Sequence, residues 1–457
     1  MFKFCCPFIV LAALVFSGGS MALEVSRGLT HHQVVQCDDD GTADMALTGT
    51  ATTTGSLEAR VVGVQKTIRD WVSLGAAAES WTATLSDVPV GGPYRVELRV
   101  VADGATLATT TIHDVLVGDV WVLAGQSNMQ GVGDRHDEDT PHPQVHTFSM
   151  SYEWRLAQEP LHTLAESPDQ VHFDQNKTEE QRQKEISNWR DGTKGTGLGL
   201  PFAKEMLRRT GRPVGLIASA HGGTSMGQWN PALKDQGGAS LYGSMLQQVA
   251  AAGGKVRGVL WYQGESDANA DASPVFPAKL RELVAAMRRD FGNPELPFYQ
   301  VQIGRVVLGW HPNSWDTIQT AQLALETDTP HTGTVASIDL EIDDAIHIGT
   351  PGLKTLGYRL ANLAEANLYG GTALGGPRYE SMTRDGLQLR VTFSGDAPQS
   401  IYKAEFDPEN PNGLILFTNN QLPENPHLWY GRGLDPYCNI VDEAQMALPV
   451  FGPVALP

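Results

Sequence analysis

The sequence has 457 residues, of which 41% are hydrophobic and 19% are charged, and its formal net charge is −19 at pH 7. This is the composition of a globular protein that is long enough for two or three domains. Proteins that bind nucleic acid contact phosphates with clustered Lys and Arg, so an excess of carboxylates argues against a nucleic-acid partner.

The first 22 residues have the pattern of a secretory signal peptide. Lys3 precedes an apolar run from Phe8 to Phe16, and Ser20-Met21-Ala22 is a small-x-small cleavage pattern. We therefore expect an exported protein, secreted or periplasmic. No later stretch approaches the about 20 apolar residues that a membrane-spanning helix requires, so we expect no membrane span.

Two of the four cysteines, Cys5 and Cys6, lie within this signal peptide, and Cys37 and Cys438 remain in the mature chain. An oxidising compartment permits these two to form a disulfide that would join the two ends of the mature protein. Two separate buried thiols are the alternative. The sequence does not show whether the two residues meet, so both possibilities stay open.

Residues 23–115 show short alternating runs in place of helical periodicity. Apolar and charged residues alternate from Tyr94 to Val100 after the Gly91-Gly92-Pro93 turn, and Trp81–Leu85 and Thr106–Ile112 fit further strands. These patterns predict a small antiparallel β-sandwich domain.

Residues 116–370 show buried strands that alternate with helices. The helices are indicated by the apolar spacing from Leu280 to Phe291, by Pro201 and Gly211 at two helix ends, and by Leu353 to Leu363. This alternation predicts a parallel sheet with helices on both faces. The predicted strands are Val120–Ala124, Val214–Ala218, Val256–Tyr262, Pro297–Ile303 and Thr334–Leu340.

A polar motif follows each of four predicted strands, and the carboxyl ends of parallel strands meet at one edge of the sheet. A serine hydroxyl is a weak nucleophile unless a base takes its proton, and the base needs a carboxylate to orient it. Ser127 is the candidate nucleophile, and Asp344 and His347 supply the other two groups. The four motifs are Gly125-Gln-Ser-Asn128, His221-Gly-Gly-Thr224, Gln263-Gly-Glu-Ser-Asp267 and Asp343-Asp-Ala-Ile-His347.

Acyl transfer also needs hydrogen-bond donors directed at the developing oxyanion. The backbone amides of Ser127 and Gly222 and the side-chain amide of Gln263 are the candidates, because glycine allows close approach and glutamine carries two N–H groups. Gly223 is the alternative to Gly222. Met129 stands where the Gly-x-Ser-x-Gly elbow requires glycine, so this is not the usual α/β-hydrolase motif.

The four motifs, in this order, resemble those of sialate O-acetylesterase-type members of the SGNH hydrolase superfamily. The first is Gly118-Asp-Val-Trp-Val-Leu-Ala-Gly-Gln-Ser-Asn-Met129, and the third is Trp261-Tyr-Gln-Gly-Glu-Ser-Asp267. The likeness is strong over residues 118–365. It implies a flavodoxin-like α/β fold, flanked here by small β-rich domains at residues 23–115 and 371–457.

The resemblance also implies residue roles. It makes Ser127 the nucleophile, His347 the general base and acid, and Asp344 its orienting partner, with the Asp-x-x-His spacing favouring Asp344 over the adjacent Asp343. It assigns the oxyanion roles to Gly222 and Gln263, where Gln263 replaces the asparagine after which the superfamily is named. No metal or organic cofactor is implied.

The predicted function is removal of acetyl groups from a carbohydrate by an exported serine esterase that resembles sialate 9-O-acetylesterases. An acetylxylan or other polysaccharide acetylesterase is the alternative within the class. A non-catalytic carbohydrate-binding protein is the alternative from another class. The oligomeric state is not predictable from these motifs.

Residues 133–196 form a long polar excursion between the first motif and the next helix. Its cluster of acidic and histidine residues, from His136 to His146, fits a solvated loop better than a metal site, because His142 and His146 lie in a Pro-flanked stretch. The aromatic residues Tyr152, Trp154 and Trp189 are candidates for stacking on sugar rings or for anchoring the loop.

Overall fold

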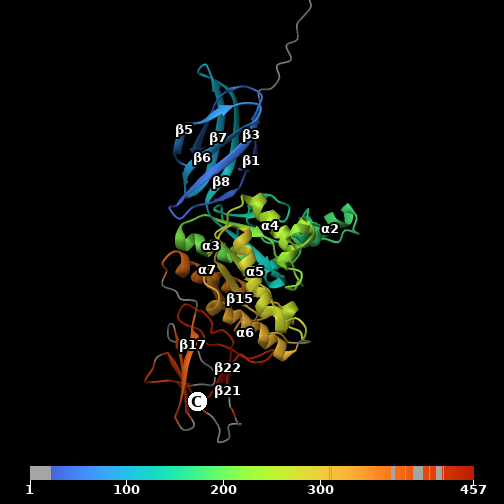
Figure 1. The fold of residues 1–457 in the computed structure, drawn as a ribbon, viewed down its shortest axis with the longest axis vertical. Helices are drawn as coiled ribbons and strands as arrows, with labels where there is room; N and C mark the ends of the chain where they lie inside the picture. Colours follow the sequence, from blue (N-terminus) through green and yellow to red (C-terminus); the bar gives the residue numbers. More distant parts are fainter. Residues whose placement is uncertain are drawn as a thin grey trace, which may run out of the picture.

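The computed structural model describes residues 22–307, 309, 311–371, 376–385, 388–394, 405–410, 412–417, 425 and 427–456. The predicted signal peptide, apart from Ala22, lies outside the described residues. Three parts follow one another along the long axis: an N-terminal β part, a central α/β part, and a C-terminal β part (Figure 1). No helix among the described residues is both long and apolar enough to cross a membrane.

The N-terminal part consists of two packed antiparallel sheets, as the alternating sequence predicts. One sheet contains β1 (Leu23–Arg27), β3 (Thr42–Ala51) and β6 (Trp81–Pro89), and the other contains β4 (Gly55–Val62), β5 (Thr67–Ala77), β7 (Gly91–Ala102) and β8 (Ala105–Gly125). Alternate residues of β3, β4 and β7 are buried between the sheets, among them Met45, Leu57, Val61 and Leu98.

Strand β8 joins the N-terminal and central parts without interruption. Its first half pairs antiparallel with β7, and the short strand β2 (Val34–Gln36) pairs parallel with its middle. From Asp119 onward it pairs parallel with strands of the central sheet. The boundary that we placed between residues 115 and 116 therefore falls inside a single 21-residue strand.

The central sheet is parallel, as expected, except for one antiparallel edge strand. Strand β8 lies at its centre, with β13 beside it on one side and β14 beside it on the other. The direction in which successive strands are added to the sheet reverses at β8. The strand order is β11 (Trp154–Leu156), β10 (Val145–Phe148), β13 (Val214–Ala218), β8, β14 (Gly258–Tyr262), β15 (Phe298–Gln302) and β16 (Thr332–Ala336).

Two groups of helices cover the faces of this sheet, so the predicted α/β fold is confirmed. Helix α3 (Gly199–Thr210) packs on α7 (Thr350–Leu368), and α5 (Phe276–Asp290) packs on α6 (Pro312–Asp328). Helix α4 (Leu241–Ala252) packs near β13. The segment 337–340, which we expected to extend the last strand, is instead a turn, and Ser337 donates its hydroxyl hydrogen to the carbonyl of Gln302.

The C-terminal part is β-rich, as expected. Its larger antiparallel sheet contains β17 (Arg378–Asp385), β18 (Gln388–Ser394), β20 (Gly413–Phe417) and β19 (Glu405–Phe406), and β21 (His427–Tyr430) pairs with β22 (Phe451–Ala455). Val391, Phe393, Leu414 and Phe451 form its core.

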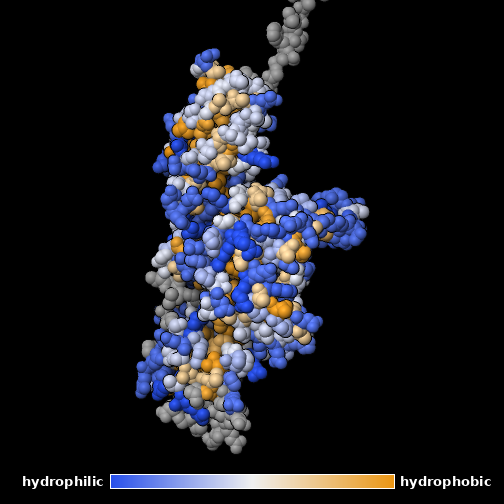
Figure 2. All heavy atoms as spheres, viewed as in Figure 1, coloured by the Kyte–Doolittle hydropathy of each residue, from blue (hydrophilic) through white to orange (hydrophobic). Residues whose placement is uncertain are grey.

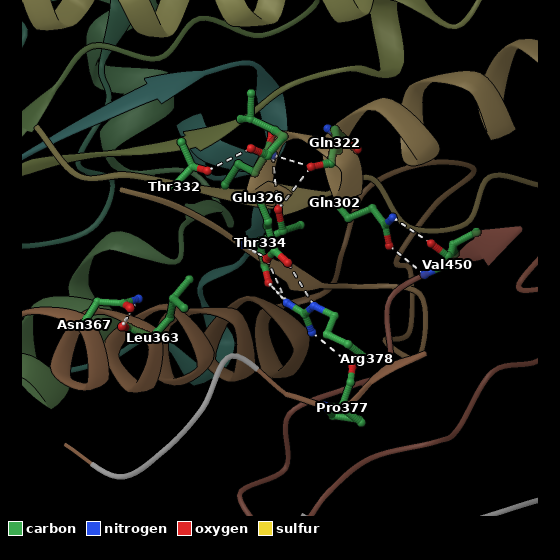
Figure 3. A network of polar contacts seen from close by, with 12 residues as sticks. Gln302, Gln322, Glu326, Thr332, Thr334, Leu363, Asn367, Pro377, Arg378 and Val450 are labelled. Atoms are coloured by element: carbon green, nitrogen blue, oxygen red, sulfur yellow. Dashed lines mark hydrogen bonds and ion pairs between the residues drawn. The ribbon is translucent and has the colours of Figure 1, made fainter. Parts of the chain in front are cut away.

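Side-chain hydrogen bonds hold this C-terminal part against the edge of the parallel sheet (Figure 3). The Arg378 guanidinium contacts the Glu326 carboxylate of α6 and the Thr334 carbonyl of β16, each at 2.8 Å. The Gln302 side chain donates to the carbonyl of Val450 and accepts from its N–H. Hydrogen bonds therefore join the central and C-terminal parts at two places.

Cys37 and Cys438 do not form a disulfide. Both are free and buried, and each lies in a separate hydrophobic cluster. Burial raises the pKa of Cys37 to about 12 and that of Cys438 to about 11. Of the two possibilities left open by the sequence, the structure contains two separate buried thiols.

Replacement of Asp339 by alanine should strongly destabilise the central part. Asp339 accepts two hydrogen bonds, at 2.8 and 2.7 Å, from Arg359, whose side chain is only 3% exposed. Loss of one partner of a buried ion pair costs about 3–5 kcal/mol. The control is Asp328→Ala, because its pair with Arg281 is about half exposed and such pairs contribute less than about 1 kcal/mol. Equal urea midpoints for the two variants would contradict the prediction.

Candidate active site

Ser127 lies at the carboxyl end of β8, where the strand order of the sheet reverses. Crevices at such positions commonly hold the active sites of α/β proteins. Gly125 has a φ of +136°, and a side chain there would place Cβ 2.1 Å from the Tyr262 carbonyl oxygen. Glycine is therefore required for the sharp exit from the strand, and Ser127 begins the short helix α1 (Ser127–Gln130) directly after it.

The structure brings Ser127, His347 and Asp344 together in one hydrogen-bonded row. Nε2 of His347 lies 2.9 Å from the Ser127 Oγ, and Nδ1 of His347 lies 2.8 Å from Oδ2 of Asp344. An ionised carboxylate only accepts hydrogen bonds, so Nδ1 carries the hydrogen of the neutral imidazole and Nε2 is left to accept from the serine. This is the arrangement that activates a serine hydroxyl.

The turn around Asp344 holds its carboxylate in place. Although partial burial alone would raise its pKa, hydrogen bonds from the His347 ring and from the backbone N–H groups of Ile346 and His347 lower the pKa of Asp344 below the ordinary value. Asp343 has different contacts: its carboxylate lies 3.6 Å from the Lys194 ammonium. The geometry thus places Asp344, and not Asp343, on the histidine.

Asn128 ties the nucleophile motif to both sides of His347, a connection that our sequence reasoning missed. Its Oδ1 accepts from the N–H of Ile348 at 3.0 Å, and its Nδ2 donates to the carbonyl of Ile346 at 3.5 Å. The same Nδ2 donates to Glu265 at 2.8 Å, and burial raises the pKa of that carboxyl. The signal available in the sequence was that Asn128 and Glu265 are polar members of the first and third motifs.

Replacement of Asn128 by alanine should therefore lower kcat by about tenfold to a hundredfold, with a smaller change in KM. The physical reason is that a displacement of a reacting group by about 1 Å can cost a factor of that size. Steady-state rates with p-nitrophenyl acetate test this result. Asn176→Ala, which removes an exposed local hydrogen bond, is the control. An unchanged kcat for folded Asn128→Ala would rule out this positioning role.

Two backbone donors expected at the oxyanion position lie close to Ser127. The N–H of Ser127 itself has no acceptor in the part of the chain that the structure describes. Gly222 lies close to Ser127, because a Cβ added to Gly222 would be 3.4 Å from the Ser127 Cβ. The N–H of Gly222 donates to Oε1 of Gln130 at 2.8 Å. The side-chain oxygen of Gln130 therefore already accepts the hydrogen bond that the Gly222 N–H can donate. Gly223 has a φ of +70° and open space beside it.

Gln263 does not present the free side-chain donor that we expected. Its Nε2 donates to the Thr224 carbonyl at 3.1 Å and to Asp267 at 2.6 Å, so both of its hydrogens are already used. Asp267 also accepts from the N–H of Met226, and burial raises its pKa. In this geometry Gln263 links two turns at the edge of the sheet.

The excursion at residues 133–196 is more ordered than its composition indicated. It contains helix α2 (Glu179–Arg190), which begins with a capping box formed by Thr178 and Gln181. The helix projects sideways from the central part (Figure 1), and its surface is hydrophilic (Figure 2). A cavity of about 600 Å³ lies beside α2 and reaches Gln130.

The acidic residues of the excursion face cations, and its aromatic residues anchor it. Asp137 pairs with Lys354, Glu138 with Arg135, and Asp139 with Lys204. Trp154 is buried in the core, Tyr152 donates to Asp169, and Trp189 donates to the carbonyl of His162. Among the described residues, no group of three or more potential ligands could hold a metal ion.

Comparison with known proteins gives consistent results. Residues 117–366 match the family described as carbohydrate esterase, sialic acid-specific acetylesterase. A probable carbohydrate esterase of Arabidopsis thaliana is 27% identical over 54% of this chain and 90% of its own length. The sialate O-acetylesterase of Homo sapiens is 24% identical over 74% of this chain and 67% of its own.

Among solved structures, a carbohydrate acetylesterase from Xanthomonas citri has a similar fold. It aligns with a TM-score of 0.65 and 22% sequence identity, covering 94% of this chain and 99% of that chain. The likeness therefore extends over the N-terminal, central and C-terminal parts.

Proposed function

The chain belongs to the sialic acid-specific acetylesterase family of carbohydrate esterases, and we propose that Ser127, His347 and Asp344 carry its reaction. It is a carboxylic ester hydrolase that removes O-acetyl groups from carbohydrates. This membership favours an enzyme over the non-catalytic binding protein that the sequence left as an alternative. The observation that carries the assignment of residues is the row of hydrogen bonds from Asp344 through His347 to the Ser127 hydroxyl.

The reaction begins when the Ser127 Oγ attacks the acetyl carbonyl while His347 Nε2 accepts the serine proton. The tetrahedral intermediate expels the sugar hydroxyl, which takes its proton from His347, and leaves an acetyl-enzyme. Water then attacks the acetyl group while His347 takes its proton; the bond to the Ser127 Oγ breaks, His347 returns the proton to that oxygen, and acetate is released. The carboxylate of Asp344 stabilises the imidazolium that forms in both steps.

We propose that the N–H groups of Ser127 and Gly222 donate hydrogen bonds to the oxyanion that forms on the acetyl carbonyl oxygen. The acetyl carbonyl would replace the carboxamide oxygen of Gln130 on Gly222, so one acceptor is exchanged for another. Gly223 remains the alternative donor. Because the two hydrogens of Gln263 are already committed, its contribution would require those contacts to break.

The substrate that we favour is an O-acetylated sialic acid, with acetylated xylan or another polysaccharide as the alternative. The family description and the curated sialate O-acetylesterases support the first choice. We also propose export from the cell, on the N-terminal pattern of residues 1–22.

Acetate release from a panel of substrates tests this proposal. The panel contains 9-O-acetylated N-acetylneuraminic acid, acetylated xylo-oligosaccharides and p-nitrophenyl acetate. We expect kcat/KM to be highest for the sialic acid. A preference for the xylo-oligosaccharides would shift the assignment to the alternative, and absence of acetate from both sugars would contradict carbohydrate deacetylation.

A further inference from the structure

A buried chain of hydrogen-bonded side chains lies behind the turn that carries Gly222. Oγ of Ser244 in α4 donates to Asp169, which also accepts from the hydroxyl of Tyr152. Nε2 of His172 lies 3.0 Å from the same Ser244 Oγ, and Nδ1 of His172 lies 3.1 Å from Nδ1 of His221. The centroids of the two imidazole rings are 5.2 Å apart and their planes differ by 24°, so the rings meet edge to edge through the two Nδ1 atoms. None of these groups belongs to the triad.

The chemistry of the groups fixes the direction of every hydrogen bond in this chain. The Asp169 carboxylate only accepts, so it receives the single hydrogen of Ser244, and Ser244 must then accept from Nε2–H of His172. Burial lowers the pKa of His172 to about 3, and its imidazole is therefore neutral, with Nδ1 bare. Consequently His221 donates from Nδ1–H.

A neutral His221 that carries its hydrogen on Nδ1 has a bare Nε2, which is a hydrogen-bond acceptor. Burial lowers the pKa of His221 as well, which favours the neutral ring. Nε2 has no partner within the described ranges and is not among the buried polar atoms that lack one, so it is open to solvent. The backbone holds His221 beside the nucleophile motif, because its N–H donates to the Gly125 carbonyl at 3.0 Å.

We propose that His221 Nε2 is a fixed acceptor for a hydroxyl of the substrate adjacent to the acetylated oxygen, and that Asp169, Ser244 and His172 position it by setting its tautomer. The proposal rests on the proposed function, since sugars carry such neighbouring hydroxyls. It makes His221 a residue that distinguishes polyol esters from simple alkyl esters. A site built to accept from a hydroxyl discriminates against the analogue that lacks it, because the acceptor is then left unpaired.

A pair of small esters tests this inference independently of which sugar is the substrate. 2-Hydroxyethyl acetate and propyl acetate have nearly the same size and differ by one hydroxyl. For the unaltered protein we expect kcat/KM to be at least about fivefold higher with the hydroxyl-bearing ester, the order of one neutral hydrogen bond. His221→Leu should bring the ratio close to one, and His221→Gln, which retains an acceptor, should keep part of the preference.

The same ratio in all three proteins would overturn the proposal, as would an unaltered protein without preference. Equal losses on both esters in His221→Leu would mean that His221 only supports the glycine turn, which also overturns it. Failure of the proposed function is read separately, from acetate release by the unaltered protein on acetylated sugars.

The tautomer can be measured without activity. In protein labelled with ¹⁵N at histidine, the signals absent from His221→Gln identify the His221 ring. We expect Nδ1 to have the chemical shift of a protonated nitrogen and Nε2 that of an unprotonated one. The reverse pattern would overturn the proposal even if His221→Leu fails to fold.

Discussion

Replacement of Ser127 by alanine is expected to lower the turnover of p-nitrophenyl acetate by about 10⁴-fold to 10⁶-fold, the range in which loss of a catalytic serine lowers kcat. The change removes one oxygen atom, which lies 2.9 Å from His347 Nε2, and leaves the strand and the α1 helix intact. Folding should be unaffected, because the hydroxyl makes no other hydrogen bond among the described residues.

Ser225→Ala is the matched control for this variant. Ser225 directly follows the motif His221–Thr224 at the same edge of the sheet, and among the described residues its hydroxyl forms a hydrogen bond only with the side chain of Gln228. We expect this variant to retain turnover within about threefold. Circular dichroism and thermal unfolding should be the same for both variants. Full turnover by a folded Ser127→Ala protein would remove Ser127 from the mechanism.

The edge of the sheet that carries the candidate site could be predicted because Ser127 and the motif at residues 221–224 each follow a strand with an unambiguous pattern. Val120–Ala124 and Val214–Ala218 are fully buried, and such strands read as continuous apolar runs. Parallel strands place their carboxyl ends at one edge, so Ser127 and the turn at 343–347 were expected at the same edge of the sheet. The exact hydrogen bonds of Asp344 needed coordinates, since two adjacent carboxylates were available.

Helix α6 was not predicted, because polar residues on its buried face interrupt the apolar periodicity by which a helix is recognised. Helix α6 directs Gln319 and Gln322 inward, where their side-chain amides donate to backbone carbonyls of the β14 and β15 strand ends. An amphipathic pattern assumes that polar residues face solvent, so this helix did not produce one. Helix α2 could have been found from Thr178 and Gln181, which form a capping box.

The oxyanion donors were the least predictable part of the site. A sequence shows that Gly222 and Gln263 can donate, but not whether another group already accepts from them. In the structure, Gln130 accepts from Gly222, and Asp267 accepts from Gln263. The acceptor nitrogen of His221 could not be predicted from the sequence either. Which ring nitrogen of His221 carries the hydrogen depends on Asp169, 52 positions earlier in the chain.

The second large effect is expected from Asp344→Asn, which should lower kcat by about 10³-fold to 10⁴-fold. Asparagine would direct an N–H toward His347 Nδ1, which favours the tautomer that carries its hydrogen on Nε2. That nitrogen could then no longer accept the serine proton, although the geometry would be nearly unchanged. His347→Ala should cost at least as much, because it removes the base itself.

Asp343→Asn is the matched control, one residue away. Its carboxylate contacts Lys194 at 3.6 Å near the surface and makes no contact with the histidine ring, so we expect turnover within about threefold of the unaltered protein. Rates with p-nitrophenyl acetate and the unfolding midpoints of both variants decide the comparison. If Asp344→Asn kept its turnover and Asp343→Asn lost it, Asp343 and not Asp344 would be the partner of His347.

The pH profile of the unaltered protein follows from the same contacts. Because the pKa of Asp344 is lowered, its carboxylate stays ionised as the pH falls below the ordinary aspartate value of about 3.9. The acid limb of kcat/KM should therefore report protonation of the imidazole, which then cannot accept the serine proton, and not protonation of Asp344. The rate should rise with pH in a single step that involves one proton. A two-proton acid limb would show that the carboxylate titrates together with the imidazole, and would contradict the stabilising contacts assigned to the turn at residues 344–347.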